Sequence, residues 1–182
     1  MSIAKYKNKQ GDILTIYRDP DPINPRSDYD NLGSFMVKDN CPYVKSEEEC
    51  ILNFYIRDED EKLLEKAGYI FLPVYVFDHS GVIMSTNRFS CPWDSGQIGY
   101  YVVAKEKVKK EYNRKGISPK LRQEVLDILS SEVELYNKYL NGEVYGYTIE
   151  NADGVEIDSC WGYYAIKDIL EDNPEFEEEI DV

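Results

Sequence analysis

The sequence has few of the residues from which common catalytic and metal centres are built. It contains one histidine, His79, and its four cysteines, at positions 41, 50, 91 and 160, form no Cys-x-x-Cys pair. A relay of several histidines is therefore excluded. The cysteine spacing resembles no common zinc module, although a zinc site from these cysteines and His79 is the alternative. We expect buried, reduced thiols, with no metal and no cofactor.

Three further absences narrow the function class. No run of about 18 apolar residues occurs, which argues against a membrane-spanning helix. The first twelve residues mix lysine with polar residues and lack the apolar core of a secretory signal. Neither GxxxxGK[ST] nor GxGxxG after a strand is present, which argues against an ordinary nucleotide-driven enzyme. These absences predict a soluble, cytoplasmic protein without a membrane partner.

Charge is abundant and very unevenly distributed. The net charge of the chain is −14. Residues 121–182 hold 3 basic and 17 acidic side chains, so the net charge of this segment equals that of the whole chain. Residues 105–122, the basic stripe, instead hold eight basic side chains and two acidic ones. An overall acidic isoelectric point conceals such a local cationic feature.

The pattern of apolar and turn residues predicts an α+β fold, a single domain over residues 1–172 with a mostly antiparallel sheet and inserted and C-terminal helices. The predicted strands are 11–17, 69–77, 82–86, 97–104 and 143–150, with 155–158 pairing back. The predicted helices are 58–67, 105–112, 119–140 and 161–171. Residues 19–31, with three prolines, are predicted to form an extended loop. Residues 173–182 are predicted to be a frayed acidic tail.

The segment Ser90–Val102 is the most informative stretch. Its first part contains Pro92, Asp94, Ser95 and Gly96, which predict a turn, and it continues as an alternating strand. A turn has little core of its own in which to bury an indole. Trp93 is therefore expected either to plug the main core or to stand ready for a partner.

Together with the short motifs at 30–33 (DNLG), 78–81 (DHSG) and 143–147 (EVYGY), this segment resembles a family of small proteins carried by bacteriophages and gut-bacterial mobile elements. The resemblance covers roughly residues 11–170. The family is that of anti-CRISPR proteins, which implies inhibition of RNA-guided Cas nucleases. It implies no catalytic residue.

Two catalytic arrangements are the enzymatic alternatives, each a small hydrolase. In the first, Cys91 is a nucleophile with His79 as its base, although the Val82–Thr86 strand is expected to separate them. The second uses acidic side chains as acid and base or as Mg²⁺ ligands: Asp78, Asp94, Asp153, Glu156 and Asp158. Turn capping explains Asp78 and Asp94 equally simply, and we favour that interpretation.

Tyrosine is unusually frequent, with 16 in 182 residues. Neighbouring tyrosines in a strand point to opposite faces, so one of each pair is expected to lie away from the main core. Tyrosine and tryptophan are enriched at protein interfaces, although a single tyrosine more often covers the rim of a core. The predicted aromatic partner contacts are Trp93, Tyr100, Tyr101, Tyr145 and Tyr147.

The leading hypothesis is a non-enzymatic inhibitor that binds a type II Cas nuclease with its guide RNA and blocks recognition or cleavage of target DNA. The predicted acidic contacts are Glu143, Glu150, Asp153, Glu156, Asp158, Glu175, Glu177, Glu178 and Glu179. The predicted contacts to guide RNA or duplex DNA are Lys105, Lys107, Lys109, Lys110, Arg114 and Lys115. For both sets a solvated surface is the plain alternative. The runner-up function is a DNA-mimicking antirestriction protein.

Overall fold

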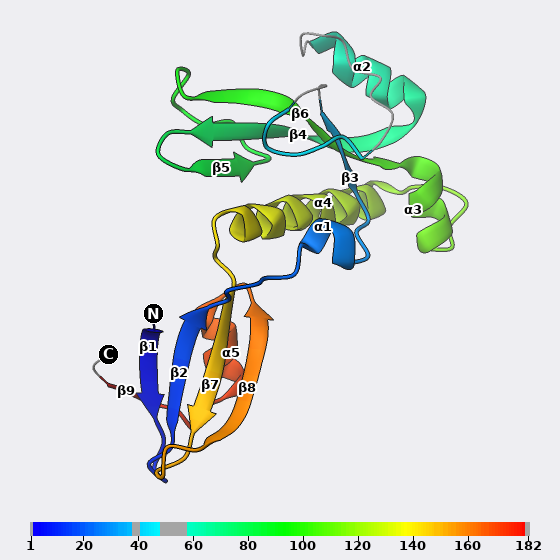
Figure 1. The fold of residues 1–182 in the computed structure, drawn as a ribbon. Coiled ribbons are helices and arrows are strands. Elements are labelled where there is room, and N and C mark those ends of the chain that lie inside the picture. Colours follow the sequence, from blue (N-terminus) through cyan, green and yellow to red (C-terminus); the bar gives the residue numbers. More distant parts are fainter. Residues whose placement is uncertain (1, 38–40, 48–57, 181–182) are drawn as a thin grey trace. The chain divides into compact units, whose positions relative to one another are not determined.

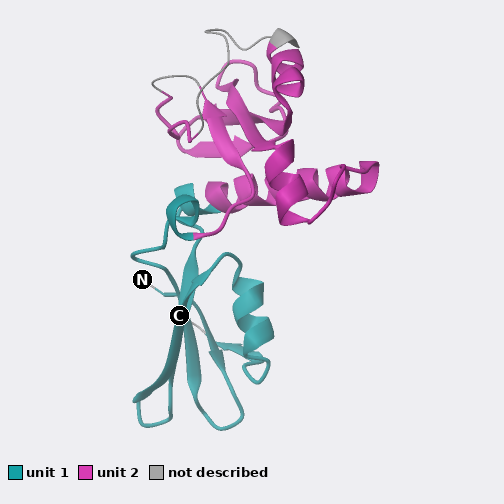
Figure 2. Ribbon diagram, turned by 90° about the vertical axis from the view of Figure 1, so that its right-hand side faces the viewer, with its two compact units in different colours: residues 1–28, 138–182 teal, residues 29–137 magenta. Residues whose placement is uncertain are grey.

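The computed structural model describes residues 2–37, 41–47 and 58–180. The chain forms two antiparallel sheets and divides into two compact units (Figures 1 and 2). Unit 1 combines residues 1–28 with 138–182, and unit 2 comprises residues 29–137. The elements of unit 1 are β1 (Ser2–Lys7), β2 (Ile13–Arg18), α1 (Pro25–Asp28), β7 (Tyr145–Glu150), β8 (Glu156–Tyr163), α5 (Ile166–Asp172) and β9 (Glu178–Ile180). Those of unit 2 are β3 (Ser34–Val37), α2 (Asp58–Ala67), β4 (Tyr69–Asp78), β5 (Val82–Ser85), β6 (Ser95–Ala104), α3 (Lys105–Glu111) and most of α4 (Pro119–Leu140).

The sheet of unit 2 has the order β3-β6-β4-β5 and is covered on both faces. On one face, Leu64 of α2 packs against Tyr100 and its neighbours on β3 and β6. On the other face, the centroid of the Phe35 ring lies 4.7 Å from that of Tyr101 on β6 and 5.4 Å from that of Tyr136 on α4. Because consecutive strand residues point to opposite faces, this arrangement buries long apolar runs completely.

The sheet of unit 1 has the order β8-β7-β2-β1-β9. Helix α5 lies against one of its faces, where Ile169 packs on Leu14, Ile16 and Tyr147 (Figure 2). Phe176, between α5 and β9, completes this small core. Glycine matters at one point of the sheet, since a Cβ on Gly146 would lie 2.1 Å from the Trp161 ring.

The α+β class with antiparallel sheets is confirmed. The helix over 58–67 and the β4–β5 hairpin joined by β6 are confirmed. On α2, Asp60 and Leu64 are buried, whereas Leu63 is exposed. Helix α4 also has its predicted bounds, because Ser118 caps it by accepting from the amide of Leu121 (3.2 Å).

Several predictions are corrected by the structure. The chain pairs into two sheets rather than one, and strands β1 and β3 were not predicted. The loop over 19–31 contains the single helical turn α1. Residues 161–163 belong to β8, because pairing with β7 outweighs their helical pattern. The chain also divides into compact units near residues 28 and 138, so the expected single domain over 1–172 includes parts of both units.

The predicted frayed tail is wrong for its described part. Phe176 is buried in the core of unit 1, and β9 pairs with β1 through Lys5–Ile180, Tyr6–Glu179 and Lys7–Glu178. The apolar residues Phe176 and Ile180 anchor this segment despite its repelling carboxylates. Residues 181 and 182 lie outside the described residues. No helix in the described ranges has both the length and the apolar character needed to cross a membrane.

Candidate functional site

Two of the sequence motifs meet at one end of the unit 2 sheet. The register of β4 with β6 ends at the pair Phe77–Ser95, so the 78–81 turn and the 90–95 turn leave the sheet side by side. The amide of Asp78 donates to the carbonyl of Asp94 at 2.8 Å. The Ser95 hydroxyl closes the second turn by donating to the carbonyl of Cys91. We call residues 78–81 and 90–95 the paired turns.

The side chain of Asp94 braces the paired turns. Its Oδ2 atom accepts from the Cys91 thiol at 3.6 Å and lies 3.5 Å from Nδ1 of His79. The Asp78 carboxylate in turn accepts from the hydroxyl of Tyr43 at 2.8 Å, and this hydrogen bond is the main cause that raises the pKa of Tyr43. The paired turns are therefore fixed relative to each other by side chains as well as by the backbone.

The braced turns expose Trp93, whose side chain is 91% accessible. The indole therefore does not plug the core, and its contact with a partner stays a prediction. Exposing so large an apolar surface is unfavourable in the isolated protein. A fixed backbone beneath an exposed tryptophan is the arrangement expected of an interface anchor.

The structure also corrects the expected separation of His79 and Cys91. They contact the same carboxylate oxygen, because β4 and β6, rather than β5, bring the two turns together. The thiol nevertheless donates to Asp94 and makes no hydrogen bond to His79 in the described part of the chain. In this geometry Asp94, rather than His79, is the hydrogen-bond partner of the Cys91 sulfur.

The other predicted chemistry receives little support from the geometry. Among residues that the structure describes, no three His, Cys, Asp or Glu side chains gather closely enough to hold a metal ion. The described thiols are not buried: Cys41 and Cys91 are half-buried and Cys160 is exposed, so the expectation of buried thiols is wrong for them. Cys50 lies outside the described residues. Asp78 and Asp94 accept side-chain donors, in place of the expected backbone caps.

Four of the five predicted aromatic contacts are not exposed. Tyr100 and Tyr101 are 1% and 0% exposed, because α2 and α4 cover both faces of β6. Tyr147 is buried and Tyr145 half-buried against the core beneath α5. The expectation that one tyrosine of a neighbouring pair faces away from the core fails wherever a sheet is covered on both sides.

The DNLG motif over residues 30–33 has a structural role in unit 2. The carboxylate of Glu132 accepts the amides of Leu32 (2.7 Å) and Gly33 (2.9 Å) and the hydroxyl of Tyr101 (2.8 Å). A side chain on Gly33 would collide with Tyr101, since its Cβ would lie 2.3 Å from the ring. The predicted nucleic-acid contact Lys107 donates to the carbonyls of this motif at 2.9 Å.

The other cations of the basic stripe differ in whether they have an ion-pair partner. Lys109 pairs with Glu106 at 2.7 Å. Four predicted contacts have no ion-pair partner among the described residues: Lys105, Lys110, Arg114 and Lys115. Arg114 also lines a hollow of about 370 Å³ at the start of α4, with Tyr112 and Lys120.

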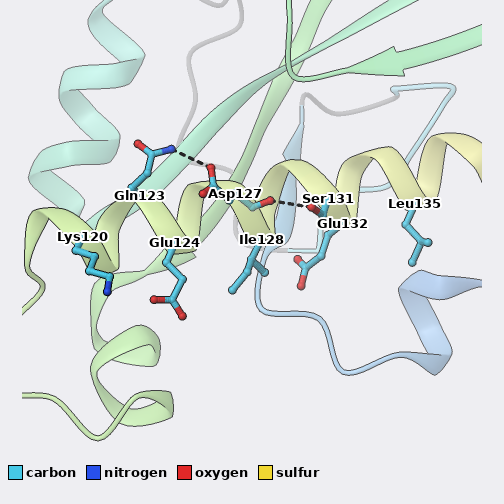
Figure 3. Close-up of a pocket in the computed structure, with 8 residues that line it drawn as sticks. All are labelled: Lys120, Gln123, Glu124, Asp127, Ile128, Ser131, Glu132 and Leu135. Atoms are coloured by element: carbon cyan, nitrogen blue, oxygen red, sulfur yellow. Dashed lines mark hydrogen bonds between the residues drawn. The ribbon is translucent and has the colours of Figure 1, made fainter.

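A larger hollow of about 650 Å³ follows the outer surface of α4 (Figure 3). Its lining combines the apolar side chains of Ile128 and Leu135 with polar residues such as Asp127, which accepts from Gln123 at 2.9 Å. Glu132 also lines this hollow. Its carboxylate oxygens already accept hydrogen bonds from the amides of Leu32 and Gly33.

The nine predicted acidic contacts all lie in unit 1 and are all exposed. Several carboxylates of this unit have fixed positions, since Tyr147 donates to Asp158 (3.1 Å) and Tyr163 to Asp172 (2.9 Å). Burial is the main cause that raises the pKa of both tyrosines, and the hydrogen-bonded carboxylates raise it further. At neutral pH these hydroxyls are therefore neutral donors.

Sequence reasoning missed Trp161 as a surface aromatic residue. It was expected in a helix, whereas it lies on β8 with 44% of its surface exposed and its ring 6.2 Å from that of Tyr17. The sequence did contain one signal for this surface aromatic residue, namely Gly146 inside a predicted strand. A glycine at such a position often marks the close approach of another group, here the ring of Trp161.

Comparison of the chain with family models, curated proteins and solved structures yields no match. The anti-CRISPR resemblance of the short motifs stays a prediction, and the function has to be argued from the surface of the molecule.

Proposed function

We propose that this protein inhibits a type II RNA-guided Cas nuclease by binding its guide-loaded complex, without catalysing a reaction. The observation that carries the proposal is Trp93, fully displayed on the braced paired turns. The resemblance of the sequence motifs supports the choice of target. In this proposal the inhibitor acts in the cytoplasm, where the nuclease complex operates.

The charge distribution assigns different contacts to the two units. The exposed carboxylates of unit 1 face basic surfaces of the nuclease, which normally bind nucleic acid. The free cations of the basic stripe contact phosphates of guide RNA or target DNA. Inhibition then weakens as salt is added, because both kinds of contact are electrostatic.

The direct test is a target-DNA cleavage assay with a purified type II Cas nuclease and guide RNA, together with co-purification of the loaded complex. We expect stoichiometric inhibition and co-purification. The Trp93→Ala variant is expected to inhibit about thirtyfold less well, since anchor tryptophans contribute about 2 kcal/mol or more. Its melting temperature is expected to stay unchanged because the indole is exposed.

Leu63→Ala is the matched control, because Leu63 is an exposed apolar residue of the same unit, on α2. Equal potency of the Trp93→Ala and wild-type proteins would remove Trp93 from the interface. No inhibition and no binding across several Cas nucleases would overturn the proposed function. Inhibition of a restriction–modification enzyme in a parallel assay would then favour the antirestriction alternative.

The acidic segment is tested separately with Glu177, Glu178 and Glu179 changed to lysine. Weaker inhibition is expected if the segment contacts the nuclease. Because Glu178 lies opposite Lys7 in the β1–β9 pair, this variant also places like charges together. A second variant with glutamine at the same three positions keeps β9 neutral and separates loss of contact from loss of the strand.

The contact of Cys91 and His79 with Asp94 favours one second candidate, a small hydrolase. In that case Cys91→Ala abolishes activity while the fold survives, and Asp94→Asn does the same. Under the proposed function, Cys91→Ala leaves inhibition of the nuclease unchanged within about twofold. The same cleavage assay therefore separates the two candidates.

A further inference from the structure

One face of the unit 1 sheet carries a flat aromatic surface. The Trp161 ring lies directly on the backbone of β7, since a Cβ added to Gly146 would come within 2.1 and 2.5 Å of two ring atoms. Tyr17 of β2 pairs with Gly146 from the other side, and its ring is tilted by 31° to the indole. We call Trp161 and Tyr17 the aromatic platform. One side of the indole rests on backbone, and 44% of the residue is exposed.

The platform lies on the face opposite α5. Leu14, Ile16 and Tyr147 alternate with the platform residues along their strands and point into the core beneath α5. Tyr17 and Gly146 therefore belong to the other face. Figure 2 shows α5 on one side of this sheet only.

Two carboxylates lie at the far end of the β7–β8 pair. Glu150 follows Gly146 and Thr148 on this face of β7, and it pairs with Glu156 across a β-bulge in β8 that follows the Ile149–Asp158 pair; both carboxylates are exposed. Like charges in such a cross-strand pair destabilise a sheet. The pair lies four residues from Gly146 along β7, a distance of about 13 Å. Thr148 and Ser159 lie opposite each other in between.

The charge of unit 1 as a whole favours a cationic ligand for this face, on which Lys5 and Lys7 of β1 lie opposite Thr15 and Ile13. Its residues include 7 basic and 17 acidic side chains. A nucleic acid is repelled by such a unit, whereas a cationic protein surface is attracted. Arginine fits the platform better than lysine, because its planar guanidinium stacks on a tryptophan ring as well as attracting its π electrons.

We propose that this face of unit 1 docks a basic protein segment, with an arginine stacked on the aromatic platform and a second basic residue between Glu150 and Glu156. In an extended segment, side chains four residues apart span the required distance of about 13 Å. The face therefore recognises Arg-x-x-x-Arg or Arg-x-x-x-Lys. The inference rests on the proposed function only for the identity of the partner, the Cas nuclease.

The test uses the full chain and synthetic peptides. The probe is a capped peptide of glycine and serine with two arginines separated by three residues. Trp93→Phe leaves Trp161 as the single tryptophan, so its fluorescence reports binding at the platform. We expect a saturable change with the arginine peptide, weaker binding when the arginines are adjacent, and none when both are glutamate.

Variants distinguish this site from general attraction. Glu150→Gln with Glu156→Gln is expected to weaken peptide binding about tenfold. The matched control is Asp168→Asn with Glu171→Gln, which removes the same charge from α5. The control is expected to change binding by less than about threefold. Trp161→Leu keeps an apolar cover over Gly146 and is expected to lose about fivefold in binding, measured by calorimetry.

Three results would overturn the inference: no saturable change at millimolar peptide, equal loss in both double variants, or a stronger response of Trp161 to single-stranded oligothymidine than to the peptide. Nuclease assays keep the two proposals apart. If the peptide results follow the expected pattern but no Cas nuclease is inhibited, the docking face stands and the proposed function fails. If inhibition is seen and is unaffected by these variants, the proposed function stands and the nuclease is not the partner of this face.

Discussion

The two units differ in where their hydrogen-bonded carboxylates lie. In unit 2, Glu132 is drawn into the structure, where both of its oxygens accept donors from residues 32, 33 and 101. In unit 1, the carboxylates stay at the surface, and tyrosines reach out to hold two of them, Asp158 and Asp172. A tyrosine hydroxyl bound to a carboxylate is therefore part of the internal structure at Glu132, whereas it lies at the surface at Asp158 and Asp172 and also at Asp78 of unit 2.

The coverage of the two sheets differs in the same way. The unit 2 sheet has helices on both faces, and the most exposed aromatic residue described in this unit, Trp93, is at a turn. The unit 1 sheet has α5 on one face, so its exposed aromatic residue, Trp161, is on a strand. Exposed aromatic residues therefore lie where no helix covers the sheet or the turn. The number of aromatic residues in the sequence does not predict these positions.

The largest expected effect comes from removing the internal carboxylate of unit 2. Glu132→Ala leaves the amides of Leu32 and Gly33 without their acceptor, which should lower the free energy of unfolding by about 3 kcal/mol. Denaturant unfolding measures this, and hydrogen exchange should rise first in residues 29–33. Asp127→Ala, an exposed position on the same helix, is the control and should change stability by less than about 0.5 kcal/mol. Similar losses in both would contradict the role of Glu132.

A smaller effect is expected from adding a methyl group in unit 1. Gly146→Ala places a Cβ against the Trp161 ring and should destabilise the fold by about 1 to 3 kcal/mol. The double variant with Trp161→Ala should lose less than the sum of the single losses, because the clash is gone. Thermal unfolding of the three variants measures this coupling, and strictly additive losses would show that the indole does not rest on β7.

Alkaline pH should affect the stability of unit 1 through Tyr163. Burial, followed by the hydrogen bond to Asp172, raises the pKa of Tyr163 well above that of the unfolded chain, about 10. The folded state therefore keeps this proton longer, so its contribution is complete below pH 10 and is lost as the pH rises further. Between pH 9 and 11 the melting temperature should fall more for the wild type than for Tyr163→Phe. Parallel curves would exclude this contribution.

The smallest expected effect has the opposite sign. Glu150→Gln with Glu156→Gln removes a like-charge cross-strand pair and should raise the stability of unit 1 by a few tenths of a kcal/mol. Denaturant midpoints at low and high salt measure it, and the gain should shrink as salt screens the repulsion. Destabilisation at low salt would mean that the two carboxylates support the sheet.

Local sequence signals predicted the elements whose causes are local. Ser118 and Pro119 begin α4, and the spacing of its apolar residues defines its length, so its bounds follow from the sequence. The hairpin around Ser80 and Gly81 is equally local. The positions of Trp161 and Tyr100 depend instead on which strand or helix packs beside them, and no short window contains that information.

The candidate site was predicted in part. The 90–95 turn and its tryptophan were identified from Pro92, Trp93 and Gly96, which act through their own backbone. The shared contact of His79 and Cys91 with Asp94 was missed, because it depends on the register between β4 and β6. Likewise, Lys107 was expected to contact nucleic acid, although its amine is bound to carbonyls 75 and 76 residues away.

Unit 1 is built from two stretches of the chain that are separated by unit 2, which determines the order in which its strands are synthesised. Strand β2 pairs on one side with β7, whose residues are separated from it by all of unit 2. On the ribosome, the contiguous residues 29–137 emerge and fold while β1 and β2 still lack most of their sheet. Leu14 and Ile16 therefore lack their packing partners Tyr147, Ile169 and Phe176 until those residues are synthesised, so we expect the β1–β2 hairpin to expose apolar side chains during synthesis.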